Sequence, residues 1–188
     1  MTYRNCRRGS ARAALISIGL AAATGLAPAG SMAADSGGVG TGGVGPTTAA
    51  PAGDEGAFPV AAKVTYGDGL GAGRGHQGQD LMAKCGKPVV AAQPGRVQLR
   101  DYDAGGAGNY LVIDGKGALE DTVYMHMHSA AKVSKGETVS AGQVIGRVGT
   151  TGSSSACHLH FEIWDGAGWY DGGSPVDPKP YLRLWERR

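Results

Sequence analysis

The stretch Cys157-His158-Leu159-His160-Phe161-Glu162 is the strongest single indication of the fold in this sequence. It places two histidines two positions apart in an apolar and aromatic run, which is typical of a β-strand. Because successive side chains of a strand point to opposite faces, His158 and His160 are expected on one face. Such a pair is either solvent-facing or hydrogen-bonded, or it belongs to a functional site. The rest of the chain has to decide between these interpretations.

Short apolar, β-branched runs of the same kind recur along the chain. Gly-rich turns separate them, and none shows a 3.6-residue apolar period of helical length. Many short strands at close spacing predict an all-β fold, with an antiparallel sheet arranged as a sandwich or in a barrel-like way. A short helical turn is expected near residues 180–185. The predicted strands are 88–92, 96–102, 109–114, 122–127, 143–148 and 158–164.

One part of the sequence is echoed by another. Gly86-Lys-Pro-Val-Val-Ala91, followed by Gly95-Arg-Val97, resembles Gly136-Glu-Thr-Val-Ser-Ala141, followed by Gly146-Arg-Val148. The repeat predicts two copies of a hairpin unit folded against each other, and chance similarity in a Gly- and Val-rich chain is the alternative. Two copies are too few for a solenoid.

The N-terminal residues have the pattern of a secretory signal peptide. Four arginines flank the start of an apolar segment at 13–27, and Ser31-Met32-Ala33 supplies the small residues of a cleavage site. The apolar segment is too short to serve well as a membrane span. We therefore expect residues 1–33 to be removed on export, and a secreted mature form without a membrane span.

Two further segments follow the expected signal peptide. Residues 34–56 are rich in Gly, Ala, Pro and Thr, which predicts a flexible tether, with an edge segment packed on the domain as the alternative. Residues 57–188 suffice for one domain. Four of the 18 basic residues lie in the signal peptide, so 14 remain against 16 acidic ones. This balance gives no support to a nucleic-acid partner, which needs a basic patch.

Other histidines extend the first pair towards a metal site. His76 and Asp80 lie four residues apart among glycines, which predicts a loop that leads into a strand at 80–82. Both residue types are zinc ligands, and one imidazole of the 158/160 pair completes a set of two histidines and one aspartate. Three protein ligands leave a coordination position open, as in catalytic zinc sites. The second imidazole of the pair, or His126, is then available for proton transfer or for stabilising an oxyanion.

Five segments together resemble the motifs of the M23 zinc metallopeptidases, the lysostaphin/LytM-type peptidoglycan endopeptidases. They occur in the order of that family and span nearly all of the expected domain. They are 73–80 (G-R-x-H-x-G-x-D), 124–126 (Y-x-H), 142–146 (G-Q-x-I-G), 148–152 (V-G-x-T-G) and 158–162 (H-L-H-F-E).

The resemblance implies a role for each matched polar residue. His76, Asp80 and His160 would bind one Zn²⁺. His158 would be the catalytic histidine that does not bind the metal, and His126 its partner in stabilising the tetrahedral intermediate.

The resemblance also implies a fold and a function. The fold would be a β-sheet with a groove, built on a duplicated hairpin arrangement. The function would be that of a secreted or wall-associated zinc endopeptidase, a monomer that hydrolyses cross-links or stem peptides of bacterial peptidoglycan. The competing function is that of a non-catalytic member that binds peptidoglycan or activates another hydrolase. Such members lack some of the metal ligands, whereas this chain has all four matched histidines and the aspartate.

The chain departs from the family pattern in places. Many relatives have an aromatic residue where this chain has Leu70-Gly71, which leaves Tyr66 as a candidate substitute. His128 has no counterpart in the motifs, and we expect it at the surface or rim although, two positions after His126, it would share that residue's strand face.

Two cysteines remain once Cys6 leaves with the signal peptide. An even number in an oxidising compartment predicts a disulfide between Cys85 and Cys157. The bond would join the segments that carry Asp80 and His158, and it would add roughly 4 kcal/mol of stability by constraining the unfolded chain. Two free buried thiols are the alternative.

Overall fold

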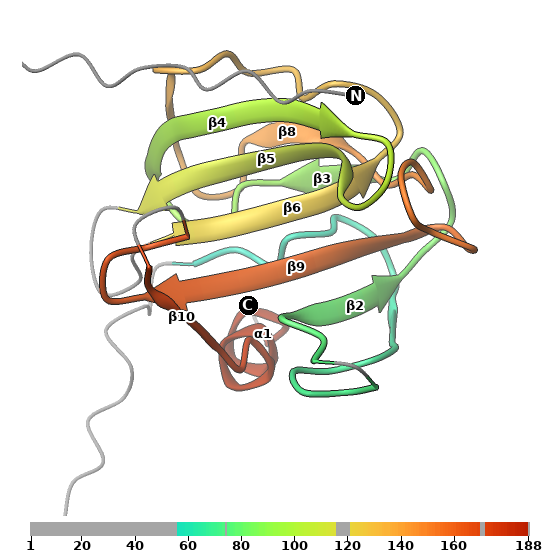
Figure 1. Cartoon of the computed structure of the whole chain (residues 1–188). Coiled ribbons are helices and arrows are strands. Elements are labelled where there is room, and N and C mark those ends of the chain that lie inside the picture. Colours follow the sequence, from blue (N-terminus) through green and yellow to red (C-terminus); the bar gives the residue numbers. More distant parts are fainter. Residues whose placement is uncertain (1–55, 74, 116–120, 170–171, 188) are drawn as a thin grey trace, which may run out of the picture. The chain divides into compact units, whose positions relative to one another are not determined.

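The structure is a computed structural model that describes residues 56–73, 75–115, 121–169 and 172–187. The expected signal peptide, and all but the last residue of the expected tether, lie outside the described residues. The described residues form antiparallel strands and one short helix (Figure 1). The prediction of an all-β fold with little helix is confirmed.

The strands are short, as the sequence predicts, and the helix is a C-terminal one of two turns. In the described part of the chain, no helix has the length and hydropathy to cross a membrane. The elements are β1 (Thr65–Tyr66), β2 (Gln79–Met82), β3 (Pro88–Val90), β4 (Gly95–Asp103), β5 (Gly108–Gly115), β6 (Asp121–Met127), β7 (Thr138–Val139), β8 (Val144–Arg147), β9 (His158–Asp165), β10 (Ser174–Val176) and α1 (Lys179–Trp185).

Most strands belong to one sheet in the order β1-β2-β9-β6-β5-β4-β7, with β10 paired to the end of β9. Strands β3 and β8 form a separate two-stranded sheet, which lies behind β4, β5 and β6 in Figure 1. Apolar side chains of both sheets, such as Val89, Leu111, Ile145 and Phe161, belong to one buried cluster. The main core therefore joins the two sheets.

The internal repeat is present, but neither copy is a hairpin. Strand β3 pairs with β8 and β4 pairs with β7, so the first strand of each copy pairs with the second strand of the other. Equivalent bonds repeat: the Gly86 N–H donates to the Val148 carbonyl at 2.7 Å and the Gly136 N–H to the Val97 carbonyl at 2.8 Å. The hairpin prediction was wrong because a repeat does not specify whether its strands pair within or between copies. The two copies do lie against each other as expected.

Strand β9 separates the core from a polar face. Leu159, Phe161 and Ile163 are fully buried in the main core. The register sets Asp80 of β2 opposite His160, and residues directly opposed in a sheet share a face. His158 and His160 both approach the Asp80 carboxylate, which confirms that the two imidazoles lie on one face.

Candidate active site

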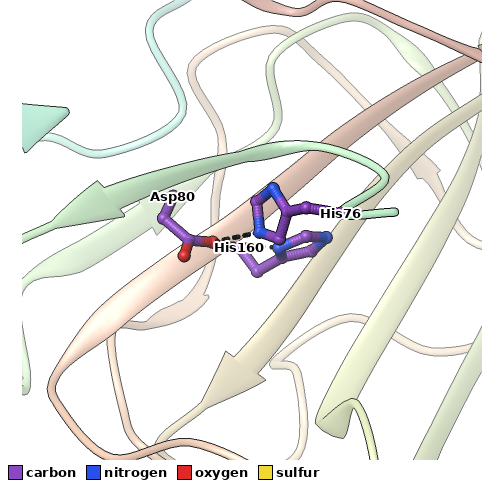
Figure 2. A group of neighbouring side chains, drawn as sticks. All are labelled: His76, Asp80 and His160. Carbon is purple, nitrogen blue, oxygen red and sulfur yellow. Dashed lines mark hydrogen bonds and ion pairs between the residues drawn. The ribbon is translucent and has the colours of Figure 1, made fainter. Parts of the chain in front are cut away.

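Three side chains from two neighbouring segments converge on one point (Figure 2). The Asp80 Oδ1 atom lies 3.0 Å from His76 Nε2 and 2.9 Å from His160 Nδ1. One candidate ligand atom from each residue falls within 4.8 Å of the others. The structure thus brings together the three residues predicted as ligands.

The loop that carries His76 depends on a glycine. A Cβ atom on Gly78 would lie 2.3 Å from the Phe161 carbonyl oxygen, a distance at which backbone atoms collide. Glycine therefore lets the loop run against β9, so that His76 comes to rest over Asp80 and His160. This close approach accounts for the second glycine of the G-R-x-H-x-G-x-D motif.

Each candidate histidine ligand is fixed by a hydrogen bond on its outer side. His76 Nδ1 lies 3.0 Å from the Gly69 carbonyl oxygen, and His160 Nε2 lies 2.9 Å from Glu162 Oε1. Both oxygens accept, so each of these nitrogens carries the proton. The opposite nitrogens, Nε2 of His76 and Nδ1 of His160, then face Asp80, and they are the ring atoms available to a metal ion. Outer partners of this kind are typical of metal-binding histidines.

Glu162 completes the support of His160 from a buried position. Glu162 is only 2% exposed. Its second carboxylate oxygen, Oε2, accepts a 2.7 Å hydrogen bond from Trp164 Nε1. A buried carboxylate is costly unless it is hydrogen-bonded, and here both oxygens have partners. Neither Glu162 nor Trp164 is expected as a site residue from the motifs, although their spacing of two and four residues from His160 puts them on the same strand face.

Electrostatics favour a cation at this point. Burial raises the pKa of Asp80, but the hydrogen bond from His160 and the neighbouring imidazoles outweigh it and leave the pKa below its usual value. Burial lowers the pKa of His160, but hydrogen bonds to Asp80 and Glu162 outweigh it and raise the pKa to about 9. Without a metal, a proton on His160 supplies the positive charge that the two carboxylates require.

His158 and His126 stand beside the three candidate ligands. Their ring centroids are 4.8 Å apart. His158 Nδ1 lies 2.9 Å from the Ala156 carbonyl oxygen, and His126 Nδ1 lies 2.9 Å from the Thr151 carbonyl oxygen. Both rings therefore carry the proton on Nδ1 and leave Nε2 free; that of His158 lies 3.6 Å from Asp80 Oδ1. Burial lowers the pKa of His126, in spite of its bond to Thr151, so this ring is neutral at pH 7.

A bulge brings His126 to this face. Between the pairs Leu111–Tyr124 and Asn109–Met127, β5 has one residue and β6 has two. Regular alternation would send His126 to the core with Tyr124, but its φ angle is 61°. Bulges re-aim side chains in this way, and a left-handed non-glycine residue costs about 1–3 kcal/mol.

The same bulge separates His128 from the site. His128 is exposed, as expected, and it does not line the cavity beside the other histidines. The expectation that it shares the face of His126 was wrong, because the left-handed residue breaks the strand's period of two.

A cavity of about 560 Å³ opens over the five residues. Residues of β2, β6 and β9 and of the loops around them line it. The other lining residues are Gly75, Gln77, Asp103, Gly106, Ala107, Met125, Ser153, Ser154, Ser155, Glu162 and Trp169. The groove implied by the family resemblance is therefore present at the site. A larger cavity, of about 680 Å³, lies between residues 56–64 and Trp185 and contains none of the histidines.

Tyr66 does not take the place of the missing aromatic residue at the groove. It packs against Phe58, with ring centroids 6.5 Å apart, and the Arg183 guanidinium lies 4.3 Å from its ring centroid. It does not line the cavity. The suggestion that Tyr66 substitutes at the site was wrong because β1 turns its ring towards α1.

Cys85 and Cys157 form a disulfide, as predicted, with Cα atoms 5.2 Å apart. The bond ties the segment after β2 to the start of β9, the two strands that carry Asp80 and His160. We expect Cys157→Ser to lower the free energy of unfolding by roughly 4 kcal/mol. Chemical denaturation of this variant and of Cys85→Ser measures the loss of unfolding free energy, with the wild-type protein in its disulfide-bonded form as the reference. Equal stability of the variants and wild type would contradict the prediction.

Comparison with known proteins places the fold and these residues in a family. The pattern of peptidase family M23 matches residues 74–178, which include all five residues of the site. The catalytic domain of lysostaphin from Staphylococcus simulans has a similar structure, with a TM-score of 0.57 and 31% identity, over 64% of this chain and 92% of that one.

Two curated relatives are endopeptidases by name. Glycyl-glycine endopeptidase ALE-1 of Staphylococcus capitis is 34% identical over 111 residues, which are 59% of this chain and 30% of that protein. The L-Ala–D-Glu endopeptidase of Bacillus subtilis is 31% identical over 151 residues, which are 71% of this chain and 44% of that protein. The chain thus spans less than half the length of either relative. It belongs to peptidase family M23.

Proposed function

We propose that this chain is a zinc-dependent endopeptidase that hydrolyses peptide bonds in bacterial peptidoglycan. One observation carries the proposal: His76, Asp80 and His160 converge within 4.8 Å under a cavity that two further imidazoles also line. A purely structural role for the cluster gives no reason for the cavity or for the two extra histidines. A non-catalytic member of the family has no need of the full set.

The three converging residues fit zinc. Imidazole nitrogen and carboxylate oxygen are donors that zinc prefers, and three of them leave one position open for water or substrate. The outer hydrogen bonds of His76 and His160 already select the nitrogens that face the centre. A zinc ion bound here supplies a Lewis acid for the scissile carbonyl and lowers the pKa of a water molecule.

His158 and His126 handle protons in this proposal. Each ring has Nδ1 bonded to a carbonyl, which leaves Nε2 as the atom for proton transfer. His158 Nε2, close to Asp80, takes the proton of the attacking water and passes it to the leaving amine. His126 lies beside His158 with its ring held by the Thr151 carbonyl, and from there it would help to stabilise the tetrahedral intermediate.

The place of action follows from the N-terminal sequence. We infer that residues 1–33 direct export, that residues 34–56 form a tether, and that the domain 57–188 acts as a secreted monomer at the cell wall. The groove accepts an extended peptide, but its loops set which bond lies over the centre. The two named relatives act on different bonds, glycyl-glycine and L-Ala–D-Glu, so the bond is a matter for experiment.

Digestion of purified sacculi tests the proposal. The purified protein is incubated with sacculi of glycyl-bridged and of directly cross-linked types, and the released peptides are identified by mass. We expect new peptide termini from one type, no products with a zinc chelator, and recovery on adding zinc. Absence of products from both types, or products that survive the chelator, would contradict the proposal.

Zinc uptake is expected to release a proton and to depend on pH. His160 has its pKa raised to about 9 in the metal-free protein, so at pH 7 its Nδ1 is protonated and must lose that proton to bind zinc. Zinc affinity should therefore rise roughly tenfold per pH unit between pH 7 and 9, and then level off. Chelator competition at pH 7, 8 and 9 measures this. A flat affinity over that range would contradict the assignment of His160 as a ligand.

A further inference from the structure

The left-handed backbone of His126 needs something to hold it. His126 is the one non-glycine residue of the described segments with a positive φ angle. A side chain disfavours this conformation, and such residues persist where their surroundings over-determine them. The question is which contacts do so here.

Thr151 bonds both to His126 and to the residue that follows it. Its carbonyl oxygen accepts the His126 Nδ1–H at 2.9 Å, and its hydroxyl donates to the Met127 carbonyl oxygen at 2.7 Å. One residue thus bonds the imidazole of His126 and the carbonyl group of the next residue. The His126 N–H, in turn, donates to the Ala107 carbonyl oxygen at 2.8 Å.

Asn109 locks Thr151 to β5. The Asn109 backbone N–H donates to Thr151 Oγ1 at 2.9 Å, and Asn109 Nδ2 donates to the Met127 carbonyl oxygen at 3.2 Å. The Thr151 hydroxyl therefore accepts from β5 and donates to β6, directly across the bulge. A hydrophobic side chain of the same shape at position 151 would leave both bonds unmade.

Gly152 allows this approach. It has a φ angle of 73°, and a Cβ atom on it would lie 2.2 Å from the Gly108 nitrogen. The loop at 148–152 can therefore touch the start of β5 only with glycine at 152. This gives a physical role to the V-G-x-T-G motif, which the catalytic proposal leaves without one.

We infer that Thr151, supported by Asn109, is a positioning residue that holds His126 in its left-handed conformation and aims its imidazole at the metal centre. The hydroxyl fixes the loop across the bulge, and the fixed loop presents the carbonyl that orients the ring. Without the hydroxyl, β6 is free to relax towards regular alternation, and His126 turns away from His158. The effect on catalysis rests on the proposed function, whereas the effect on the geometry of His126 does not.

The test compares Thr151→Val, which keeps the shape of the side chain, with Thr151→Ser, which keeps the hydroxyl. We expect Thr151→Val to lower kcat roughly 10- to 100-fold with little change in KM, as for a misplaced catalytic group. Zinc affinity should stay at the wild-type value because His126 is not a ligand. Thr151→Ser should recover most of the loss. Thr138→Val, the same change at an exposed position of β7, is the matched control and should behave as wild type.

A second readout needs no activity. Nitrogen NMR of the imidazoles should show His126 protonated on Nδ1 in wild type and in Thr151→Ser, and a mixture of tautomers in Thr151→Val. A Thr151→Val protein with wild-type kcat and tautomer would overturn the inference, and so would loss of zinc along with activity. If Thr151→Val does not fold, Asn109→Ala, which removes the side-chain donor alone, is judged by the same two readouts. If wild type hydrolyses no peptide, the proposed function fails, and the tautomers still decide the role of Thr151.

Discussion

His158→Ala should lower kcat by roughly 10²- to 10⁴-fold, the usual contribution of a general acid–base group, while the protein keeps its zinc. The imidazole lies at the edge of the centre, with Nδ1 bonded to a carbonyl and Nε2 left free. Its removal takes away the group that accepts the proton, but it leaves all three predicted zinc ligands in place. Turnover of sacculus peptides, measured beside zinc content on the same sample, separates the two effects.

His128→Ala is the matched control for this experiment. It removes an imidazole two residues from His126, but one that is exposed and outside the cavity. It should retain wild-type turnover and zinc content. A His158→Ala protein that lost its zinc would instead identify His158 as a ligand and contradict the assigned division of roles.

His160→Ala should abolish both zinc binding and hydrolysis. Only two of the predicted zinc ligands, His76 and Asp80, then remain. The buried Glu162 carboxylate also loses its imidazole partner. We expect zinc affinity to fall by more than about 100-fold, the upper limit for loss of an outer hydrogen-bonding partner. Competition with a chromophoric chelator measures the affinity of each protein.

Two milder variants grade this effect. Glu162→Gln and Trp164→Phe disturb the support of His160 but leave the imidazole in place. Each should weaken zinc binding by roughly 10- to 100-fold, less than His160→Ala does. Wild-type affinity in both variants would show that the Glu162–Trp164 pair only fills space.

The sequence predicts most of the framework because its strongest signals are local. Alternation of apolar and polar residues locates β9 and the other long strands to within a few residues. The short strands β1, β7 and β10 have two or three residues each, too few for a period to show, and they form only because a partner strand is present. The exchange of strands between the two repeats is likewise a matter of long-range pairing.

The site is predictable to the extent that regular geometry builds it. A period of two places His158, His160 and Glu162 on one face, and the family motif adds His76 and Asp80. His126 is different, because alternation assigns it to the core and only a bulge with a positive φ angle brings it to the site. The protonated nitrogen of His126 depends on the Thr151 carbonyl of a distant loop, which no local pattern encodes.

A crystal structure of the zinc-loaded protein, with the ion located by anomalous scattering, tests the central claim most directly. The account predicts one zinc ion at about 2.0–2.2 Å from three atoms, His76 Nε2, Asp80 Oδ1 and His160 Nδ1, with His158 and His126 beside it and unbound. An ion held by His158 or His126, or one bound elsewhere with these three donors free, would contradict it.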